Sequence, residues 1–214
     1  HLTIRGVIWY QGEGNAGRAA KYRDLFTTMI TEWRRAFNAD LPFYFLQISP
    51  YGYRGVNAAY LREAQLETLA LDRTGMAVTM DIGHLTDIHP KNKQEVGRRL
   101  ALWALANDYG HDIVPSGPLY KDAVVENGAM RIRFRFADSG LATRDGAAPD
   151  HFEIAGADKV FHPATASIEG RELVVASSLV SSPVAVRYAF TSEAQPNLMN
   201  REGLPASSFR TDRW

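Results

Sequence analysis

The sequence has no cysteine among its 214 residues. This absence excludes disulfides, thiolate nucleophiles and cysteine-ligated zinc. There is also no excess of either charge, because 24 Lys and Arg balance 24 Asp and Glu. A nucleic-acid partner usually needs a basic face and an anionic membrane a polybasic patch, so we expect neither. No apolar run approaches the ~20 residues of a membrane helix.

The first half of the chain alternates strand-like and helix-like segments. Apolar, β-branched and aromatic runs predict buried strands at 4–10, 43–48 and 76–80. The segments that follow them predict helices at 19–37, 58–71 and 93–108. This order predicts an α/β fold with a parallel sheet covered by helices. Sheets usually have about five strands, so three strands suggest roughly half of an α/β domain.

After Pro115 the helical periodicity disappears. Short β-like runs follow, separated by turn signals such as Asn127-Gly128. Apolar and basic residues alternate at 130–136, as expected for a sheet with one solvated face. We therefore expect a small all-β, sandwich-like module at 113–214 after an α/β part at 1–112.

One group of candidate site residues follows the first predicted strand. Ligands of open α/β sheets bind outside the carboxyl ends of the strands. There the Gln11 side-chain amide can donate to an oxyanion, Gly12 permits close backbone approach, and Glu13 can orient a neighbour or accept a substrate hydroxyl. The alternative is an ordinary glycine-rich turn.

A second group follows the third predicted strand, with two histidines and two aspartates within nine residues. His89 is suited to proton transfer near neutral pH, and Asp87 can orient it and stabilise its imidazolium form. A solvated loop is one alternative. Another is a zinc or manganese site formed by Asp81, His84, Asp87 and His89, although no helical His-x-x-x-His pair supports it.

These two groups carry a resemblance to bacterial sialate O-acetylesterases. The segment at 6–15 reads GVIWYQGEGN and is similar to that family's Gly-Val-Ile-Trp-Tyr-Gln-Gly-Glu-Ser-Asn block. The segment at 87–100, DIHPKNKQEVGRRL, resembles its histidine block, and LREAQ at 61–65 also fits. With the C-terminal segments at 183–190 and 197–212, the resemblance covers essentially the whole chain.

The resemblance implies an SGNH-hydrolase fold, which is a flavodoxin-like three-layer α/β/α sandwich. It also implies a serine enzyme that removes O-acetyl groups from sialic acid or related glycans by acyl transfer. On this interpretation His89 is the general base, Asp87 the orienting acid and Gln11 the oxyanion-hole donor. An acetylated carbohydrate is then the expected substrate, no cofactor is needed, and the resemblance points to an exported protein.

The chain departs from the family pattern at three points. The family's nucleophile lies in an N-terminal Gly-x-Ser-Asn-type block that is missing here, and Ser49, at a strand end, lacks that context. We therefore expect the serine on an upstream segment, whether a separate chain or a removed part. Gly14 replaces a serine, and Thr86 stands where SGNH hydrolases commonly carry the acid, so another acid or a carbonyl can orient His89.

Two interpretations from other classes stay open. A carbohydrate-binding protein without catalysis predicts sugar binding that survives His89→Ala. A metal-dependent hydrolase that uses the loop at 81–89 predicts loss of activity with a chelator. The serine esterase predicts indifference to chelators and sensitivity to serine-directed inhibitors.

Overall fold

Three parallel strands form the sheet of the first half of the chain. They are β1 (Val7–Trp9), β2 (Phe43–Leu46) and β3 (Thr74–Ala77), in the order β1-β2-β3. Val7 pairs with Phe43, and Phe43 pairs with Thr74 on its other side. The computed structural model describes residues 3–214.

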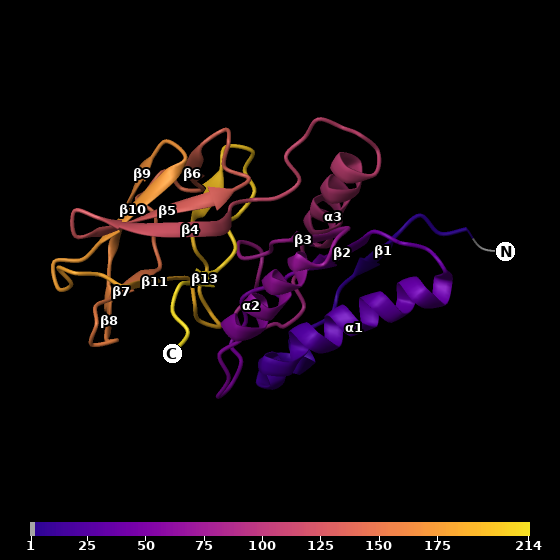
Figure 1. Cartoon of the computed structure of the whole chain (residues 1–214), viewed down its shortest axis with the longest axis horizontal. Helices are drawn as coiled ribbons and strands as arrows, with labels where there is room; N and C mark the ends of the chain where they lie inside the picture. Colours follow the sequence, from indigo (N-terminus) through magenta and orange to yellow (C-terminus); the bar gives the residue numbers. More distant parts are fainter. Residues whose placement is uncertain (1–2) are drawn as a thin grey trace.

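Helices cover both faces of this sheet. They are α1 (Ala19–Phe37), α2 (Ala59–Glu67) and α3 (Lys93–Asn107), with the 3₁₀ helices η1 (Glu13–Arg18) and η2 (Thr68–Ala70). In Figure 1, α3 lies above the sheet and α1 and α2 lie below it. The alternating side chains of β2 explain this arrangement: Phe43 and Phe45 pack with Phe26 of α1, whereas Tyr44 packs with Trp103 of α3.

β1 is an edge strand and is only partly covered. Trp9 packs toward Phe26 and Phe43 on the α1 side, so Ile8 points to the opposite face. There α3 packs against β2 and β3, and Ile8 stays 71% exposed. Within residues 3–214, the outer edge of β1 pairs with no other strand.

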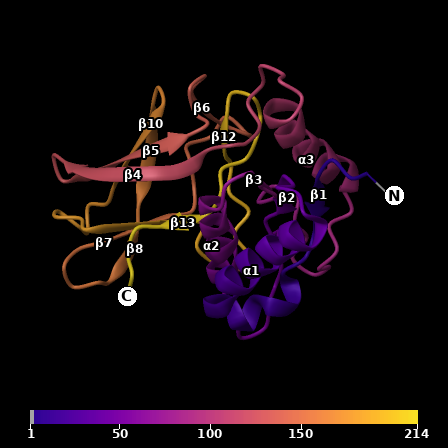
Figure 2. The ribbon, with the colours of Figure 1, turned by 45° about the vertical axis from the view of Figure 1, so that its right-hand side comes forward.

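From Leu119 onward the assigned elements are all strands. They are β4 (Leu119–Glu126), β5 (Ala129–Arg135), β6 (Leu141–Thr143), β7 (Phe152–Ala155), β8 (Phe161–Pro163), β9 (Thr165–Glu169), β10 (Glu172–Ala176), β11 (Ala185–Tyr188), β12 (Leu198–Asn200) and β13 (Phe209–Arg210). Two four-stranded sheets, β4-β5-β10-β9 and β13-β11-β7-β8, form two layers, and β12-β6 is a third, two-stranded sheet (Figure 2). Met130 and Ile132 of β5 are buried while Arg133 is exposed, as the alternation predicts.

Buried polar contacts join α2 and the end of β2 to C-terminal segments that lie next to strands β11 and β13. Gln47 donates to the Ser207 hydroxyl at 2.8 Å. The Arg62 guanidinium donates to the Ser208 hydroxyl and to the Thr191 carbonyl. Arg62 is fully buried, and burial lowers its pKa to about 10. In the described part of the chain, no carboxylate forms an ion pair with it.

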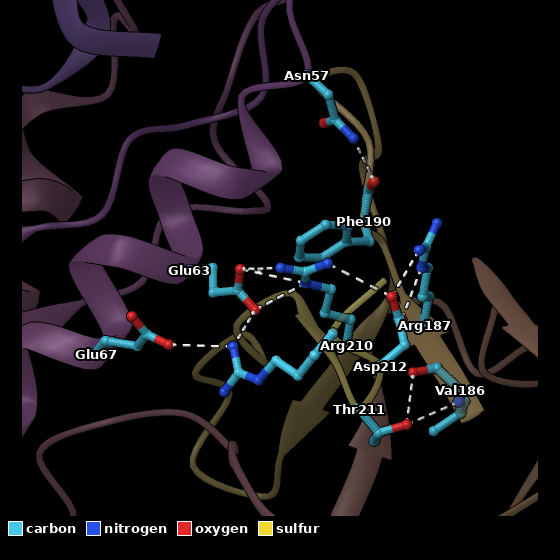
Figure 3. Close-up of polar contacts among 10 residues, drawn as sticks. Asn57, Glu63, Glu67, Val186, Arg187, Phe190, Arg210, Thr211 and Asp212 are labelled. Carbon is cyan, nitrogen blue, oxygen red and sulfur yellow. Dashed lines mark hydrogen bonds and ion pairs between the residues drawn. The ribbon is translucent and has the colours of Figure 1, made fainter. Parts of the chain in front are cut away.

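An ion-pair network crosses the same interface (Figure 3). Arg210 of β13 donates to Glu63 of α2 at 2.9 Å, and its other terminal nitrogen lies 3.4 Å from Asp212. Arg187 of β11 donates to the same Asp212 at 2.7 Å. Burial raises the pKa of the Asp212 carboxyl, but the Arg187 guanidinium outweighs it and holds the pKa below its usual value. Among the helices of residues 3–214, none has the length and apolar character needed to cross a membrane.

Candidate active site

A hollow of about 340 Å³ lies where the loops after β1 and β3 meet. Its lining comes from three parts of the chain: the end of β1 and the start of η1, the loop before α3, and the first residue of α3. The lining residues are Tyr10, Glu13, Ile88, His89 and Lys93. The two groups predicted separately from the sequence therefore meet through Glu13 and His89, at the carboxyl ends of parallel strands.

His89 presents its ring to this hollow with 85% of the side chain exposed. Its Nδ1 lies 3.5 Å from Oδ1 of Asp87, longer than a normal hydrogen bond. The same Asp87 oxygen accepts the His89 backbone N–H at 2.9 Å, and this bond is the main cause of a lowered Asp87 pKa. Asp87 is therefore a carboxylate that fixes the backbone of His89 and lies beside the Nδ1 edge of its ring, while Nε2 has no hydrogen-bond partner among the described residues.

His84 has a local role in the same loop. Its Nδ1 accepts the backbone N–H of Asp87 at 3.1 Å and that of Thr86 at 3.3 Å. The imidazole thus closes a turn just before His89. It does not line the hollow.

Gln11 is held on several sides. Its amide nitrogen donates to Asn15 at 2.8 Å, and its side-chain oxygen accepts from Tyr22 at 3.2 Å. Its backbone carbonyl accepts from Tyr22 at 3.1 Å and from Gln65 at 3.3 Å. One amide N–H of Gln11 is thus engaged within the protein, and one remains for another acceptor.

Gly12 is buried, and its position admits no side chain. A Cβ at this position would lie 2.8 Å from Cγ2 of Ile48 and 3.0 Å from the amide nitrogen of Gln65. The preceding carbonyl of Gln11 points toward Tyr22 and Gln65, so the N–H of Gly12, across the same trans peptide, points the opposite way. Packing alone therefore accounts for the glycine, and its N–H faces away from the two side chains that hold Gln11.

Gln65 organises this edge of the sheet, and the pattern of apolar residues did not single it out. Its side-chain oxygen accepts the N–H of Ile48 at 2.9 Å, and its amide donates to the carbonyls of Leu46 and Gln11. The side chain is fully buried, and all three partners are backbone groups. Its only signal in the sequence is its place within the LREAQ segment.

Tyr10 and Lys93 complete the lining, and sequence reasoning missed both. The Lys93 ammonium lies 4.5 Å from the centroid of the Tyr10 ring, within cation–π range. Burial, followed by the negative charge of Glu13, raises the pKa of the Tyr10 phenol to about 12. Tyr10 is therefore protonated at neutral pH and can donate a hydrogen bond.

Asp81 is engaged elsewhere, which weakens the metal interpretation. Both its carboxylate oxygens accept from Arg99 at 2.7 Å, and Arg99 also contacts Glu95 at 2.8 Å. Residues 3–214 bring no three potential His, Asp or Glu ligands together. The four residues at 81–89 are therefore not arranged as a ligand set.

Ser49 does not line the hollow. It is buried, with 4% exposure, and its hydroxyl lies against the Tyr10 phenol. Across the described chain, no serine or threonine is among the residues that line the hollow with His89.

Comparisons with known proteins agree with the resemblance. A family model described as "Carbohydrate esterase, sialic acid-specific acetylesterase" matches residues 1–106. Sialate O-acetylesterase of Mus musculus is 32% identical over 162 residues, covering 63% of this chain and 29% of the relative. The Rattus norvegicus protein of the same name is 33% identical over 144 residues, which cover 56% of this chain and 27% of the relative.

A solved structure extends the likeness to nearly the whole chain. The crystal structure of XAC1771, titled a novel carbohydrate acetylesterase from Xanthomonas citri, matches with a TM-score of 0.95 and 47% identity. The match covers 99% of this chain and 51% of that one. This chain thus spans about half of the length of that structure and less than a third of the two rodent proteins. Together these matches show that the chain belongs to the sialate O-acetylesterase family of carbohydrate esterases.

Proposed function

We propose that this chain is the histidine-bearing part of a carbohydrate O-acetylesterase acting on sialic acid or related acetylated glycans. The observation that carries the proposal is the exposed His89 ring, which shares a hollow with Glu13 and Tyr10 and has Asp87 at 3.5 Å. Family membership supplies the reaction class.

The nucleophile in this proposal is a serine on a segment outside residues 3–214. The lining of the hollow offers no serine, and β1 leaves its outer edge and Ile8 open for a further part of the sheet. This chain matches about half of the length of XAC1771, which agrees with a serine on a separate segment. With that segment added, the sheet and its two helix layers make the three-layer SGNH-hydrolase sandwich, followed by the β module.

His89 acts as the general base in the proposed reaction. The serine Oγ attacks the acetyl carbonyl carbon while its proton passes to Nε2 of His89, and Asp87 stabilises the imidazolium from the Nδ1 side. The tetrahedral intermediate collapses, the C–O bond to the sugar breaks, and the departing sugar oxygen takes the proton from His89. Water then repeats the sequence on the acetyl-enzyme and releases acetate and free serine.

The oxyanion is stabilised by donors from the loop after β1. The N–H of Gly12 faces away from Tyr22 and Gln65, and Gln11 keeps one free amide N–H. One such donor contributes about 3 kcal/mol to lowering the barrier. Glu13 accepts a hydroxyl of the sugar in this arrangement.

The test is intact mass after a fluorophosphonate probe, with the chain alone and mixed with the segment proposed to supply the serine. The proposal expects no adduct alone and one adduct in the mixture. A stoichiometric adduct on the chain alone would overturn the division and make Ser49 the first suspect.

The binding-protein interpretation is separated from the esterase by His89→Ala in the same mixture. The esterase loses hydrolysis of an acetylated glycan by at least about a hundredfold, because a general base contributes 10²–10⁴-fold. A binding protein shows no hydrolysis to lose and keeps its affinity for sugar. Hydrolysis that survives the substitution would contradict the role given to His89.

A further inference from the structure

A second hollow, of about 640 Å³, lies between the start of α1, α2 and β13. Small residues line one part of it, among them Ala16, Gly17 and Ala20. Its wall and rim carry Tyr60, Arg23 and Glu67. This volume falls within the range of about 300–1,000 Å³ that is usual for small-ligand sites. We call it the α1–α2 groove.

The groove borders the hollow at His89. Glu13, the first residue of η1, lines the hollow at His89, whereas Ala16 and Gly17 of the same η1 line the groove. A 3₁₀ helix rises about 2 Å per residue, so roughly 6–8 Å separate the two along η1. The two hollows therefore lie within the length of a short oligosaccharide.

The lining suits a ligand that both donates and accepts hydrogen bonds. Arg23 and Arg210 offer donors, and Asp24, Glu63 and Glu67 offer acceptors, so both signs are interspersed with a slight excess of negative charge. An anionic ligand would meet that excess, and a purely apolar one would cover charged groups without forming any hydrogen bond to them. The hydroxyls of a neutral sugar match both kinds of group.

Tyr60 supplies the apolar contact that a sugar ring needs. It is 39% exposed and lines the groove. Two side chains pack against its ring: the Arg210 guanidinium lies 4.9 Å from its centroid, and Phe190 packs edge-on at 5.2 Å. Arg210 is itself held by Glu63 and Asp212 (Figure 3), so the ring is fixed before a ligand arrives.

We infer that the α1–α2 groove binds the unreacting units of a neutral oligosaccharide whose acetylated unit lies at His89. The placement of the acetylated unit at His89 rests on the proposed function. Binding of the other sugar units in the groove does not require catalysis. It gives the esterase a preference for acetyl groups on glycan chains over acetyl groups on isolated sugars.

The experiment is calorimetric titration of this chain with neutral hexasaccharides of xylose, glucose and mannose. We expect at least one to bind with one site per chain. Tyr60→Ala should weaken binding about tenfold, the size of one aromatic contact. Ala20→Gln, which adds a longer side chain at an exposed position of the groove, should also weaken it. Tyr109→Ala, at a tyrosine 59% exposed beyond α3, is the matched control and should leave binding unchanged.

The outcomes separate this inference from the esterase proposal. No binding by any of the three sugars, or binding that both groove variants leave unchanged, overturns the inference even if the assembled enzyme cleaves acetyl esters. Groove-dependent binding that His89→Ala does not alter supports it even if no ester is cleaved.

Discussion

Gly12 stands at a closely packed position of the candidate site. Ile48 and Gln65 lie where its side chain would be, and neither can retreat easily because both belong to the packed end of β2 and α2. Gly14, two residues along η1, faces open space. The two glycines therefore have different structural requirements although they stand in the same loop.

Gly12→Ala should lower the free energy of unfolding by about 1–3 kcal/mol, the usual cost of overpacking. Gly14→Ala is the control and should change it by less than about 0.5 kcal/mol. Urea unfolding of both variants measures the difference. Equal effects would show that the loop adapts and that the close contacts around Gly12 do not matter.

Residues of the candidate site could be predicted from the sequence only where they directly follow a predicted strand. His89, Asp87, Gln11 and Glu13 were predicted because they follow strands in the chain. Gln65 could not be found in this way, since its role depends on helix α2 lying across the ends of two strands.

At the scale of elements, Gln65 links α2 to the ends of β1 and β2. Its three hydrogen bonds go to backbone groups at the buried strand ends, of which the Gln11 carbonyl also accepts from Tyr22. The link fixes the distance between the two strand ends from which the site loops start.

Gln65→Leu should therefore destabilise the chain by about 1–3 kcal/mol, the cost of leaving buried backbone groups unpaired. Gln94→Leu, at an exposed position of α3, is the matched control and should have little effect. Thermal unfolding followed by circular dichroism compares them. If Gln65→Leu leaves the stability unchanged, water takes over the hydrogen bonds of the amide.

Glu95 lies in the first turn of helix α3 and pairs with Arg98 and Arg99 of the same helix. The hydrogen bond from Arg98 is the main cause that lowers the Glu95 pKa from 4.5 to about 2. A carboxyl with a lowered folded-state pKa stabilises the fold above its unfolded value, and that stability is lost as pH falls. We expect the loss between about pH 4.5 and pH 2, with Glu95→Gln flattening the profile there. Stability measured at several pH values tests this, and an unchanged profile contradicts it.

The bounds of an element were predicted well where they follow from the local sequence. They were predicted poorly where they depend on contacts between residues that are distant in the chain. The predicted helix at 19–37 coincides with α1, because its apolar spacing is complete within the helix. The predicted strand at 76–80 is instead β3 at Thr74–Ala77. It begins at Thr74, which pairs with Phe43, and Gly75 packs directly under the Trp103 ring, where a Cβ would come within 2.4 Å. That contact lies 28 positions away in the chain and leaves no local pattern.

At the scale of the whole molecule, the strands after Leu119 are held to α2 by the network through Arg210. Glu63 and Asp212 are both largely buried, so removing the arginine would leave two carboxylates with fewer partners. A surface pair such as Arg35 with Glu32 has no such consequence, because both side chains are solvated.

Arg210→Met should thus cost about 3 kcal/mol, as expected for breaking a buried pair by removing one partner. Arg35→Met is the control and should cost less than about 1 kcal/mol. The double variant Glu63→Gln with Arg210→Met should cost less than the sum of the single changes. Additive costs would show that the network is not coupled.

Arg62 and Gln47 have a consequence for the evolutionary history of this chain. Both are buried in the α/β part, yet their hydrogen bonds end on Thr191, Ser207 and Ser208 at the far end of the sequence. If an unrelated module replaced the β module, the buried Arg62 guanidinium would lose its hydrogen-bond acceptors. We therefore expect the two parts to have been inherited together, and any recombination between family members to preserve this set of contacts as a unit.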